Sequence, residues 1–272
     1  MASQVNHFKE FETVAQYEAY IQPDDYAKPL VALVDETDTV MFPQGGGGGD
    51  CGNPIMKSVD VEDYSGGASF SGFGQITDVT FPSGITSLAN NALFLCTGLT
   101  SVDIPSGVTS IGQQAFDGCT SLASVTVPST VTSIGNYAFR GDSSLTGIDL
   151  SGTSVTTTGN YTFQKCSSFA SVSLPSGLTT IGQQAFDGCR ALTSITLPST
   201  VTVIGSSAFQ NCSSLLSFTC LATTPPTLGT NALLNTPANM VIYVPSESVE
   251  TYKIRGGWLN YESQIQAIPA TP

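Results

Sequence analysis

Charged residues are scarce in this chain of 272 residues, at 11% of the total. Lys and Arg together number 8 against 21 Asp plus Glu, which gives a net charge of −13. Such a chain repels a polyanion, so we do not expect nucleic acid as a partner. The single histidine, His7, lies near the N-terminus, and nothing in the sequence places it near a Ser or Cys nucleophile. We therefore expect that the protein is not an enzyme.

Long apolar runs are also missing. No stretch of 18 apolar residues occurs, so no membrane insertion is expected. The opening residues, MASQVNHFKEFETV, lack the apolar centre of a signal peptide. The glycine run at 45–49 lacks the GK[ST] and the helix of a phosphate-binding loop, so we expect a mobile loop and no cofactor.

The main feature that is present is a repeat of about 23 residues, close to LxxVxIPSxVTxIGxxAFxxC. Residues 111–119 and 181–189 are two identical copies of one part, IGQQAFDGC. The clear copies begin at Leu99, Leu122, Leu145, Phe169 and Leu192, with weaker ones at Ile76 and Leu215. The copy at Leu145 is one residue longer and has lost its proline. A period of this length is typical of a solenoid, whose units bury their apolar faces only against one another.

Each repeat contains the pattern of a short strand followed by a return segment. Apolar residues alternate with small polar ones in LxxVxI, which favours a strand that the proline then ends. We expect Gly112 and its equivalents to permit the turn between the two sides of the coil. Together these features predict a β-rich solenoid with a parallel strand stack, about 30 Å long for seven coils.

The recurring core IPxxVxxIGxxAFxxC resembles the BspA-like leucine-rich repeats, a bacterial variant of the leucine-rich repeat. The resemblance covers about residues 76–222 and implies a right-handed coil in a surface-exposed, non-catalytic protein used for adhesion or partner binding. The common leucine-rich repeat has Asn or Cys a few residues after its strand, where this chain has Gly107, Thr130 or Gly177. The segment from VIYVPSESVETYKIRGGW to YESQIQAI is similar to the closing segment that often follows such arrays.

Three regions are predicted. Residues 1–65 form an α+β N-terminal module, with a short helix in FETVAQYEAYI and two strands around the DETD turn of LVALVDETDTVMF. Residues 66–222 form the solenoid. Residues 223–272 form a C-terminal cap, in which VIYVP is a strand, two short helical stretches follow, and Trp258 closes the open end of the core.

The cysteines of the array share one repeat position, which predicts a buried column: Cys96, Cys119, Cys166, Cys189 and Cys212. We expect them to serve as small apolar fillers, although stacked neighbours could approach disulfide distance. Asp142 stands where the column would otherwise continue. A linear column without a nearby histidine does not converge on a metal, so no metal site is expected.

The acidic side chains of the array are predicted to be solvated. Asp103 and Asp149 share an outward strand position, and Asp117 and Asp187 share a turn. The outward strand face carries short hydroxyl side chains in irregular columns, which offer none of the aromatic or arginine anchors that dominate binding hot spots.

The candidate contact residues lie instead in the turns around AFxxC. Arg140, Lys165 and Arg190 are the only cations of the array. Tyr137 and Tyr161 occupy the positions just before AF, or TF in the copy at Leu145, and we expect these positions to be exposed. Stacking would bring these five residues to one edge of the solenoid. A protein or glycan could bind there, and ordinary solvated turns are the alternative interpretation. Asp142 is added to this set as a further position at which the copies disagree.

Two hypotheses on function follow. One is a cell-surface or extracellular adhesion or recognition protein that uses the array for display. The other is a structural or fibre subunit of a phage virion or secretion assembly, docked through residues 1–65, which could also form homo-oligomers.

Overall fold

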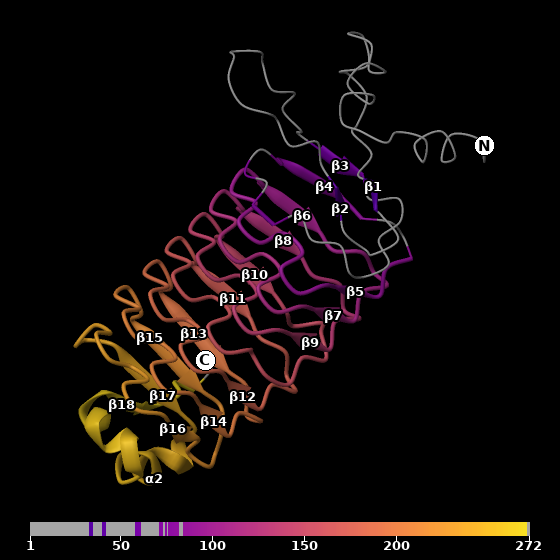
Figure 1. Cartoon of the computed structure of the whole chain (residues 1–272). Coiled ribbons are helices and arrows are strands. Elements are labelled where there is room, and N and C mark those ends of the chain that lie inside the picture. The colour runs from indigo at the N-terminus through magenta and orange to yellow at the C-terminus, as the bar shows by residue number, and fades with distance from the viewer. Residues whose placement is uncertain are drawn as a thin grey trace, which may run out of the picture.

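The computed structural model describes residues 76–81 and 84–270, positions 71, 72 and 74, and the backbone of three short strands before them. Two of these, β1 (Leu33–Val34) and β2 (Val40–Met41), pair in antiparallel fashion around the predicted DETD turn. The predicted helix at 11–21 and the glycine run at 45–49 lie outside the described residues. The repeats form a tall stack of coils with short helices at the C-terminal end (Figure 1).

We number the coils by the repeat copies. Coil 1 begins at Ile76, coil 2 at Leu99, coil 3 at Leu122, coil 4 at Leu145, coil 5 at Phe169, coil 6 at Leu192 and coil 7 at Leu215. These coils stack on one another with their strands in parallel, which confirms the predicted parallel β-solenoid.

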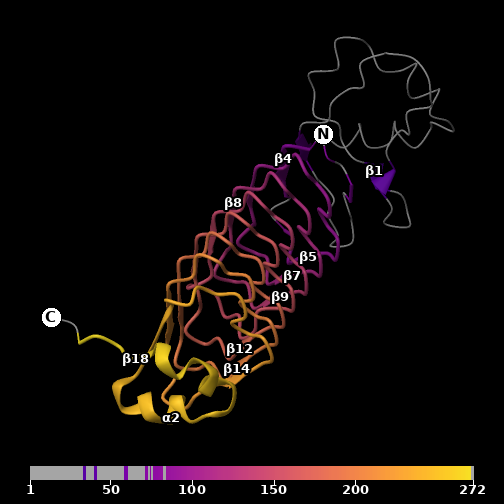
Figure 2. The same ribbon diagram turned by 90° about the vertical axis from the view of Figure 1, so that its left-hand side faces the viewer.

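One side of the stack consists of the strands formed by the LxxVxI part of each repeat, together with one strand before the repeats and two after them (Figure 2). They pair in parallel as β3–β4, β6–β8, β10–β11 and β13–β15–β17–β18. Their bounds are β3 Ser58–Asp60, β4 Asp78–Thr80, β6 Ser101–Asp103, β8 Ser124–Thr126, β10 Gly147–Asp149, β11 Ser171–Ser173, β13 Ser194–Leu197, β15 Ser217–Cys220, β17 Val241–Val244 and β18 Ile265–Ala267. The stack therefore begins at β3, inside the predicted N-terminal module, and continues through the predicted cap.

The opposite side consists of two-residue return strands. They pair in parallel as β5–β7–β9 and β12–β14–β16. Their bounds are β5 Ser87–Leu88, β7 Ser110–Ile111, β9 Ser133–Ile134, β12 Thr180–Ile181, β14 Val203–Ile204 and β16 Thr227–Leu228. Coil 4 has only the isolated bridge Thr157–Thr180 on this side. Gly147 pairs with Ser171, 24 positions later, whereas Ser101 pairs with Ser124, 23 positions later, which confirms that coil 4 is one residue longer.

A ladder of phenylalanines runs through the core. Phe116, Phe139, Phe163, Phe186 and Phe209 are fully buried, and each ring stacks on the next with centroids 5.1–5.6 Å apart. Stacking of equivalent aromatic rings adds to the burial of their apolar area. The repeat thus builds a continuous column of phenylalanine rings through the core.

Gly112 has a role different from the predicted one. Its φ is not in the left-handed region, so glycine is not needed there for a turn. A Cβ atom at Gly112 would lie 2.5 Å from the carbonyl carbon and oxygen of Ala89 in the preceding coil. Gly135 likewise lies against the backbone of Gln113. These glycines allow neighbouring coils to approach closely, because any side chain would collide with the backbone below.

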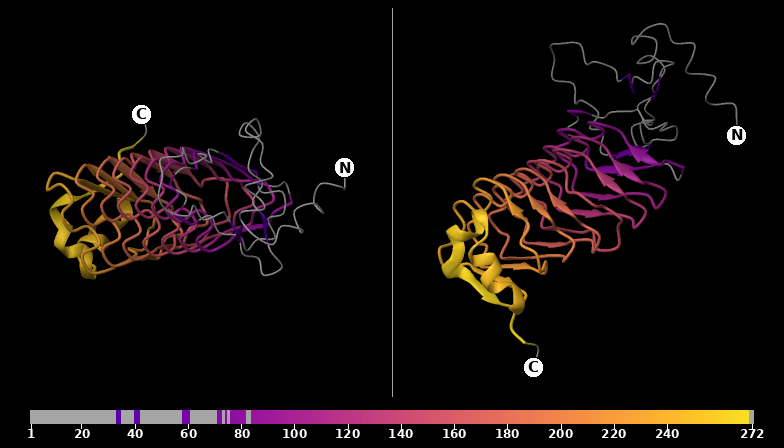
Figure 3. Two further views of the ribbon diagram at one scale, coloured as in Figure 1. Left: turned by 45° about the horizontal axis from the view of Figure 1, so that its top comes forward. Right: turned by 90° about the horizontal axis from the view of Figure 1, so that it is seen from below.

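The C-terminal cap closes the last coil (Figure 3). It contains η3 (Ser246–Ser248), α2 (Val249–Lys253) and η4 (Gly256–Gln264). Trp258 is 1% exposed, packs against Phe218 and Tyr252, and donates from Nε1 to the Pro226 carbonyl at 2.8 Å. The predicted role of Trp258 in closing the core is confirmed.

Candidate functional site

The segment that follows the column of Gly112 equivalents forms one edge of the solenoid, which we call the turn edge (residues 113–118, 136–141, 160–165 and 183–188). Tyr137 and Tyr161 lie here on neighbouring coils, and their rings stack nearly parallel with centroids 4.6 Å apart. The Arg140 guanidinium carbon lies 4.8 Å from the centroid of the Tyr137 ring. The structure therefore brings three of the five predicted contact residues into one cluster.

Tyr137 and Tyr161 have φ values of 61° and 62°. Other coils have Asn91, Gln114, Gln184, Ser207 and Asn231 at this position, also with positive φ. This left-handed region favours Gly, Asn and Asp, so a bulky side chain there is uncommon and strained. Both tyrosines are half-buried rather than exposed as predicted.

Arg140 is held by a carboxylate of the preceding coil. Its Nε donates to Asp117 Oδ1 at 3.0 Å and its Nη2 donates to Oδ2 at 2.7 Å, a bidentate ion pair. Gln114 Nε2 also donates to Asp117 Oδ2, at 3.1 Å. Asp117 is only 3% exposed, so the prediction that it is solvated is wrong. The pair holds Arg140 against Tyr137 and neutralises much of its charge.

Lys165 and Arg190 are exposed on coils 4 and 5. Neither side chain has a hydrogen bond or ion pair within the described part of the chain. Lys165 has a φ of 64°, at a position where other coils have Gly118, Gly141 or Gly188. Its Cα and Cγ lie within 4 Å of where a Cβ of Gly188 would be. Lys165 therefore extends the turn edge beyond the tyrosines, and Arg190 lies just after its last segment, but no contact joins either cation to the cluster.

Asp142 is not a surface residue, so its predicted place among the recognition residues is wrong. It is fully buried in the cysteine column, and neither carboxyl oxygen has a hydrogen-bond partner. Burial raises the pKa of the Asp142 carboxyl well above its ordinary value, and the negative charge of Asp117 adds to this. The nearby backbone N–H groups of Cys119 and Gly118 lower the pKa but do not offset the effect of burial. A neutral, protonated carboxyl group is the form that fits this site.

The cysteines around Asp142 are buried and free, as predicted. Four of the thiols also donate to a backbone carbonyl of the preceding coil: Cys119 to Leu93 at 3.1 Å, Cys166 to Phe139 at 3.0 Å, Cys189 to Phe163 at 3.2 Å and Cys212 to Phe186 at 3.1 Å. The cysteines therefore provide hydrogen bonds as well as volume. Burial raises the pKa of Cys212 to about 12, which leaves its thiol unreactive.

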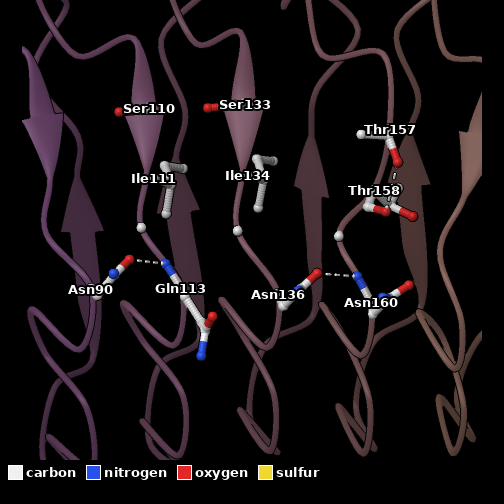
Figure 4. A pocket seen from close by; sticks show the side chains of 13 residues that line it. Asn90, Ser110, Ile111, Gln113, Ser133, Ile134, Asn136, Thr157, Thr158 and Asn160 are labelled. Atoms are coloured by element: carbon white, nitrogen blue, oxygen red, sulfur yellow. Dashed lines mark hydrogen bonds between the residues drawn. The ribbon is translucent and has the colours of Figure 1, made fainter.

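A shallow groove of about 490 Å³ crosses the return side of coils 1–4 (Figure 4). We call it the glycine groove, and its lining comprises residues 110–113, 133–136 and 157–160, together with Asn90. Its floor is the glycine column, one wall has the hydroxyls of Ser110, Ser133 and Thr157, and the other has amide side chains. None of the lining residues is charged.

The amide wall is held by bonds between coils. The Gln113 backbone N–H donates to Asn90 Oδ1 at 2.7 Å, and the Asn160 backbone N–H donates to Asn136 Oδ1 at 2.8 Å. Asn160 Oδ1 in turn accepts from the Gln183 N–H at 2.9 Å. An asparagine ladder therefore exists in this solenoid, at a repeat position different from that of the common leucine-rich repeat. This ladder was not predicted from the sequence, although the recurring GNY at 135–137 and 159–161 is a signal for it.

A second hollow, of about 400 Å³, lies beside coil 4 where its proline is lost, and Asp149 lines it. Asp149 Oδ1 accepts the Ser151 N–H at 2.9 Å, and this bonding to Ser151 lowers the pKa of the carboxyl. The carboxylate is thus engaged in a local turn.

Among the described residues, no group of three or more His, Cys, Asp or Glu side chains is arranged to hold a metal ion. The same residues contain no helix with the length and apolar character that crossing a bilayer requires.

Comparison with known families gives one extended match. The profile described as BspA type leucine rich repeat region matches residues 63–154 and 134–253, with six copies. No curated protein matches the chain.

Two solved structures share the fold. A leucine-rich repeat protein from Bacteroides ovatus has 26% identity and a TM-score of 0.60, over 79% of this chain and 54% of its own. A leucine rich cell surface protein from Faecalibacterium prausnitzii has 27% identity and a TM-score of 0.54, over 72% of this chain and 54% of its own. This chain therefore spans about half the length of each of these proteins.

Proposed function

Because the chain belongs to the BspA-type leucine-rich repeat family, we propose that it is a non-catalytic recognition protein that displays a contact site for a protein or glycan partner on its solenoid. Solenoids of this family are generally non-catalytic and mediate interactions. The similarity to a cell surface protein of Faecalibacterium prausnitzii supports a cell-surface or extracellular location. Adhesion is the form of recognition that we propose.

The observation that carries this proposal is the stacked pair Tyr137–Tyr161 on the turn edge. Both residues occupy left-handed backbone positions where other coils have small or amide side chains. Strain of this kind is concentrated at functional sites, where the side chain is needed for something other than folding. Tyrosine and arginine are also the residue types enriched in binding hot spots.

The neighbouring contacts prepare the pair for binding. Arg140 is fixed by Asp117, and its guanidinium contacts the Tyr137 ring. Neither tyrosine hydroxyl has a hydrogen bond within the described residues, so both can bond to a partner. Side chains that are already ordered lose less conformational entropy on binding. We propose Lys165 and Arg190 as outer contacts that attract an acidic partner surface and speed association.

The proposal can be tested with two substitutions that suit the backbone. Tyr137→Asn and Tyr161→Asn together remove the rings, and asparagine tolerates a positive φ. Partners are first identified by pull-down and glycan-array screening with the whole chain. We expect the double variant to lose at least about tenfold in affinity for such a partner.

The matched control is Asn231→Ser, at the same repeat position in coil 7 and with a φ of 60°. It should bind like the natural chain. Equal binding by the double variant would rule out the turn edge as the contact site.

The alternative hypothesis is a structural or fibre subunit docked through residues 1–65. It concerns a part of the chain of which the structure describes only the strands β1, β2 and β3.

A further inference from the structure

We propose that the glycine groove binds an extended, uncharged oligosaccharide that lies along the axis of the stack. This inference rests on the proposed recognition function and gives the ligand class of a second surface, beside the tyrosine pair. Asn136 and Asn160, which line the groove, directly precede Tyr137 and Tyr161 in the sequence.

The groove is a fixed part of the fold rather than a gap left by a mobile side chain. At Gly135 and Gly159, a Cβ would lie 2.5–2.6 Å from the nearest backbone atom of the preceding coil. No side chain can therefore grow from the floor without separating the coils. The amide wall is equally fixed, since each bond from a backbone N–H to an amide oxygen ties one coil to the next.

Those same bonds leave hydrogen-bond donors free for a ligand. The amide oxygens of Asn90, Asn136 and Asn160 each accept a backbone N–H, which fixes the amide orientation. Their NH₂ groups have no partner within the described residues. The hydroxyls of Ser110 and Ser133 on the opposite wall likewise have no hydrogen-bond partner within the described residues. Donors on one wall and hydroxyls on the other match a ligand with hydroxyl groups on both edges.

Other ligand classes fit the groove less well. An anionic or cationic ligand would find no charged side chain in the lining. Ile111 and Ile134 are only 2% and 5% exposed, so little apolar surface is available for a hydrophobic ligand. An extended peptide would need free backbone groups for strand addition, but β5, β7 and β9 pair with one another.

The groove is confined to part of the stack, although the glycine column continues. On the hydroxyl wall, the positions equivalent to Ser133 are Thr180 in coil 5 and Val203 in coil 6. Val203 is 38% exposed and lies outside the lining. The amide wall likewise has Ser206 in coil 6. Coil 6 therefore offers positions of the same geometry at which substitutions serve as controls.

The experiment measures binding of the whole chain to neutral tetrasaccharides of β-linked glucose, mannose and N-acetylglucosamine by titration calorimetry. A sulfated tetrasaccharide and an uncharged extended peptide are the comparison probes. Ser133→Tyr places a large ring across the groove, and Val203→Tyr is its control in coil 6. Asn136→Asp retains the acceptor for the Asn160 N–H but removes the NH₂ donor, and Ser206→Asp controls for its added charge.

We expect at least one neutral tetrasaccharide to bind, with affinity at least about tenfold lower in Ser133→Tyr and in Asn136→Asp, and unchanged in both controls. Absence of binding by every neutral probe would overturn the proposal. So would binding that Ser133→Tyr leaves intact, or binding of the sulfated probe or the peptide alone.

The tyrosine variants separate this inference from the proposed function. If Tyr137→Asn/Tyr161→Asn loses an identified partner while no neutral oligosaccharide binds, the groove proposal fails and the recognition function stands. If a neutral oligosaccharide binds in the groove and the double variant retains every identified partner, the groove stands and the tyrosine contact site fails.

Discussion

The segments 111–119 and 181–189 have the same nine residues, IGQQAFDGC, but different surroundings. Their inner residues behave alike, because Phe116 and Phe186 are fully buried and the thiols of Cys119 and Cys189 both donate to a carbonyl of the preceding coil. Their outer residues do not. Asp117 is buried and bound to Arg140, whereas Asp187 is partly exposed and accepts from Gln164 and Asn211.

The difference arises from the neighbouring coils. Inside the solenoid most residues meet their own repeat equivalent, so identical sequences find similar contacts. The exception is Cys119, whose equivalent in the next coil is Asp142. At the turn edge each residue meets whichever side chain the next coil carries. Coil 3 brings Arg140 to Asp117, and coil 6 brings Asn211 to Asp187. The repeat therefore determines the core, and the departures from it determine the surface.

The largest effect is expected where the two segments are most alike, at Gly112 and Gly182. A Cβ at either position would collide with backbone of the preceding coil, at Ala89 for Gly112 and at the Gly159 carbonyl oxygen for Gly182. We expect Gly112→Ala and Gly182→Ala each to lower the free energy of unfolding by about 3 kcal/mol, measured by urea denaturation.

The control for these glycines is Gly177→Ala, since a Cβ there has nothing within 4 Å. It should change stability by less than about 0.5 kcal/mol. A large difference between Gly112→Ala and Gly182→Ala would mean that the two cores are not equivalent.

The next largest effect is expected at the cysteine position of the coil that follows each segment. This position has Asp142 after residues 111–119 and Cys212 after residues 181–189. Asp142→Cys should restore the column and remove a buried carboxyl group without a partner. We expect the free energy of unfolding at pH 7 to rise by about 2 kcal/mol, measured by urea denaturation.

The raised pKa of Asp142 also predicts that the free energy of unfolding depends on pH. Burial raises the pKa of Asp142 in the folded state, so the stability it contributes is present at low pH. That stability is lost as the pH rises above about 4, where the unfolded carboxyl ionises. The unfolding free energy of the natural chain should therefore fall relative to that of Asp142→Cys with rising pH. Asp142→Asn should remove the pH dependence without the gain in stability. If the unfolding free energies of the natural chain and of Asp142→Cys changed in parallel with pH, the raised pKa of Asp142 would be contradicted.

A smaller difference in stability is expected between removing the partner of Asp117 and removing a partner of Asp187. Arg140→Ala leaves the buried Asp117 carboxylate with Gln114 alone, and we expect a loss of about 2 kcal/mol by urea denaturation. The matched change, Asn211→Ala, leaves Asp187 partly exposed and still bound to Gln164, with an expected loss of about 0.5 kcal/mol. Equal losses would show that the burial of Asp117 has no energetic consequence.

The smallest effect on stability is expected from Tyr137→Asn with Tyr161→Asn. Loss of the ring stacking costs about 1 kcal/mol, and relief of the two left-handed tyrosines offsets much of that loss. The net change should lie within about 1 kcal/mol in the same urea measurement. A much larger loss would mean that the tyrosines are retained for folding rather than for binding.

Several features of the fold were predictable from the residues because periodicity encodes them. The strand of each coil, the buried phenylalanines, the cysteine column and the closing role of Trp258 all follow from repeated apolar positions and their interruption. Of the site, sequence alone placed Tyr137, Arg140 and Tyr161 near one another, because equivalent positions on neighbouring coils must be adjacent.

Other features depended on partners that a single repeat does not reveal. The burial of Asp117 required Arg140 from the next coil, and the isolation of Asp142 followed from a position that elsewhere holds a thiol. The glycine groove was missed because it arises from close packing of coils, which removes side chains from its floor and ties its amide wall together.

The sequence by itself determined the solenoid, its core and the edge on which the unusual residues gather, because a repeat fixes which positions stack. Only the tertiary structure decided which charges are paired, which carboxyl group is buried without a partner and where the surface is hollow. Those properties depend on distances between side chains of different coils, and it is the exceptions to the repeat that set them.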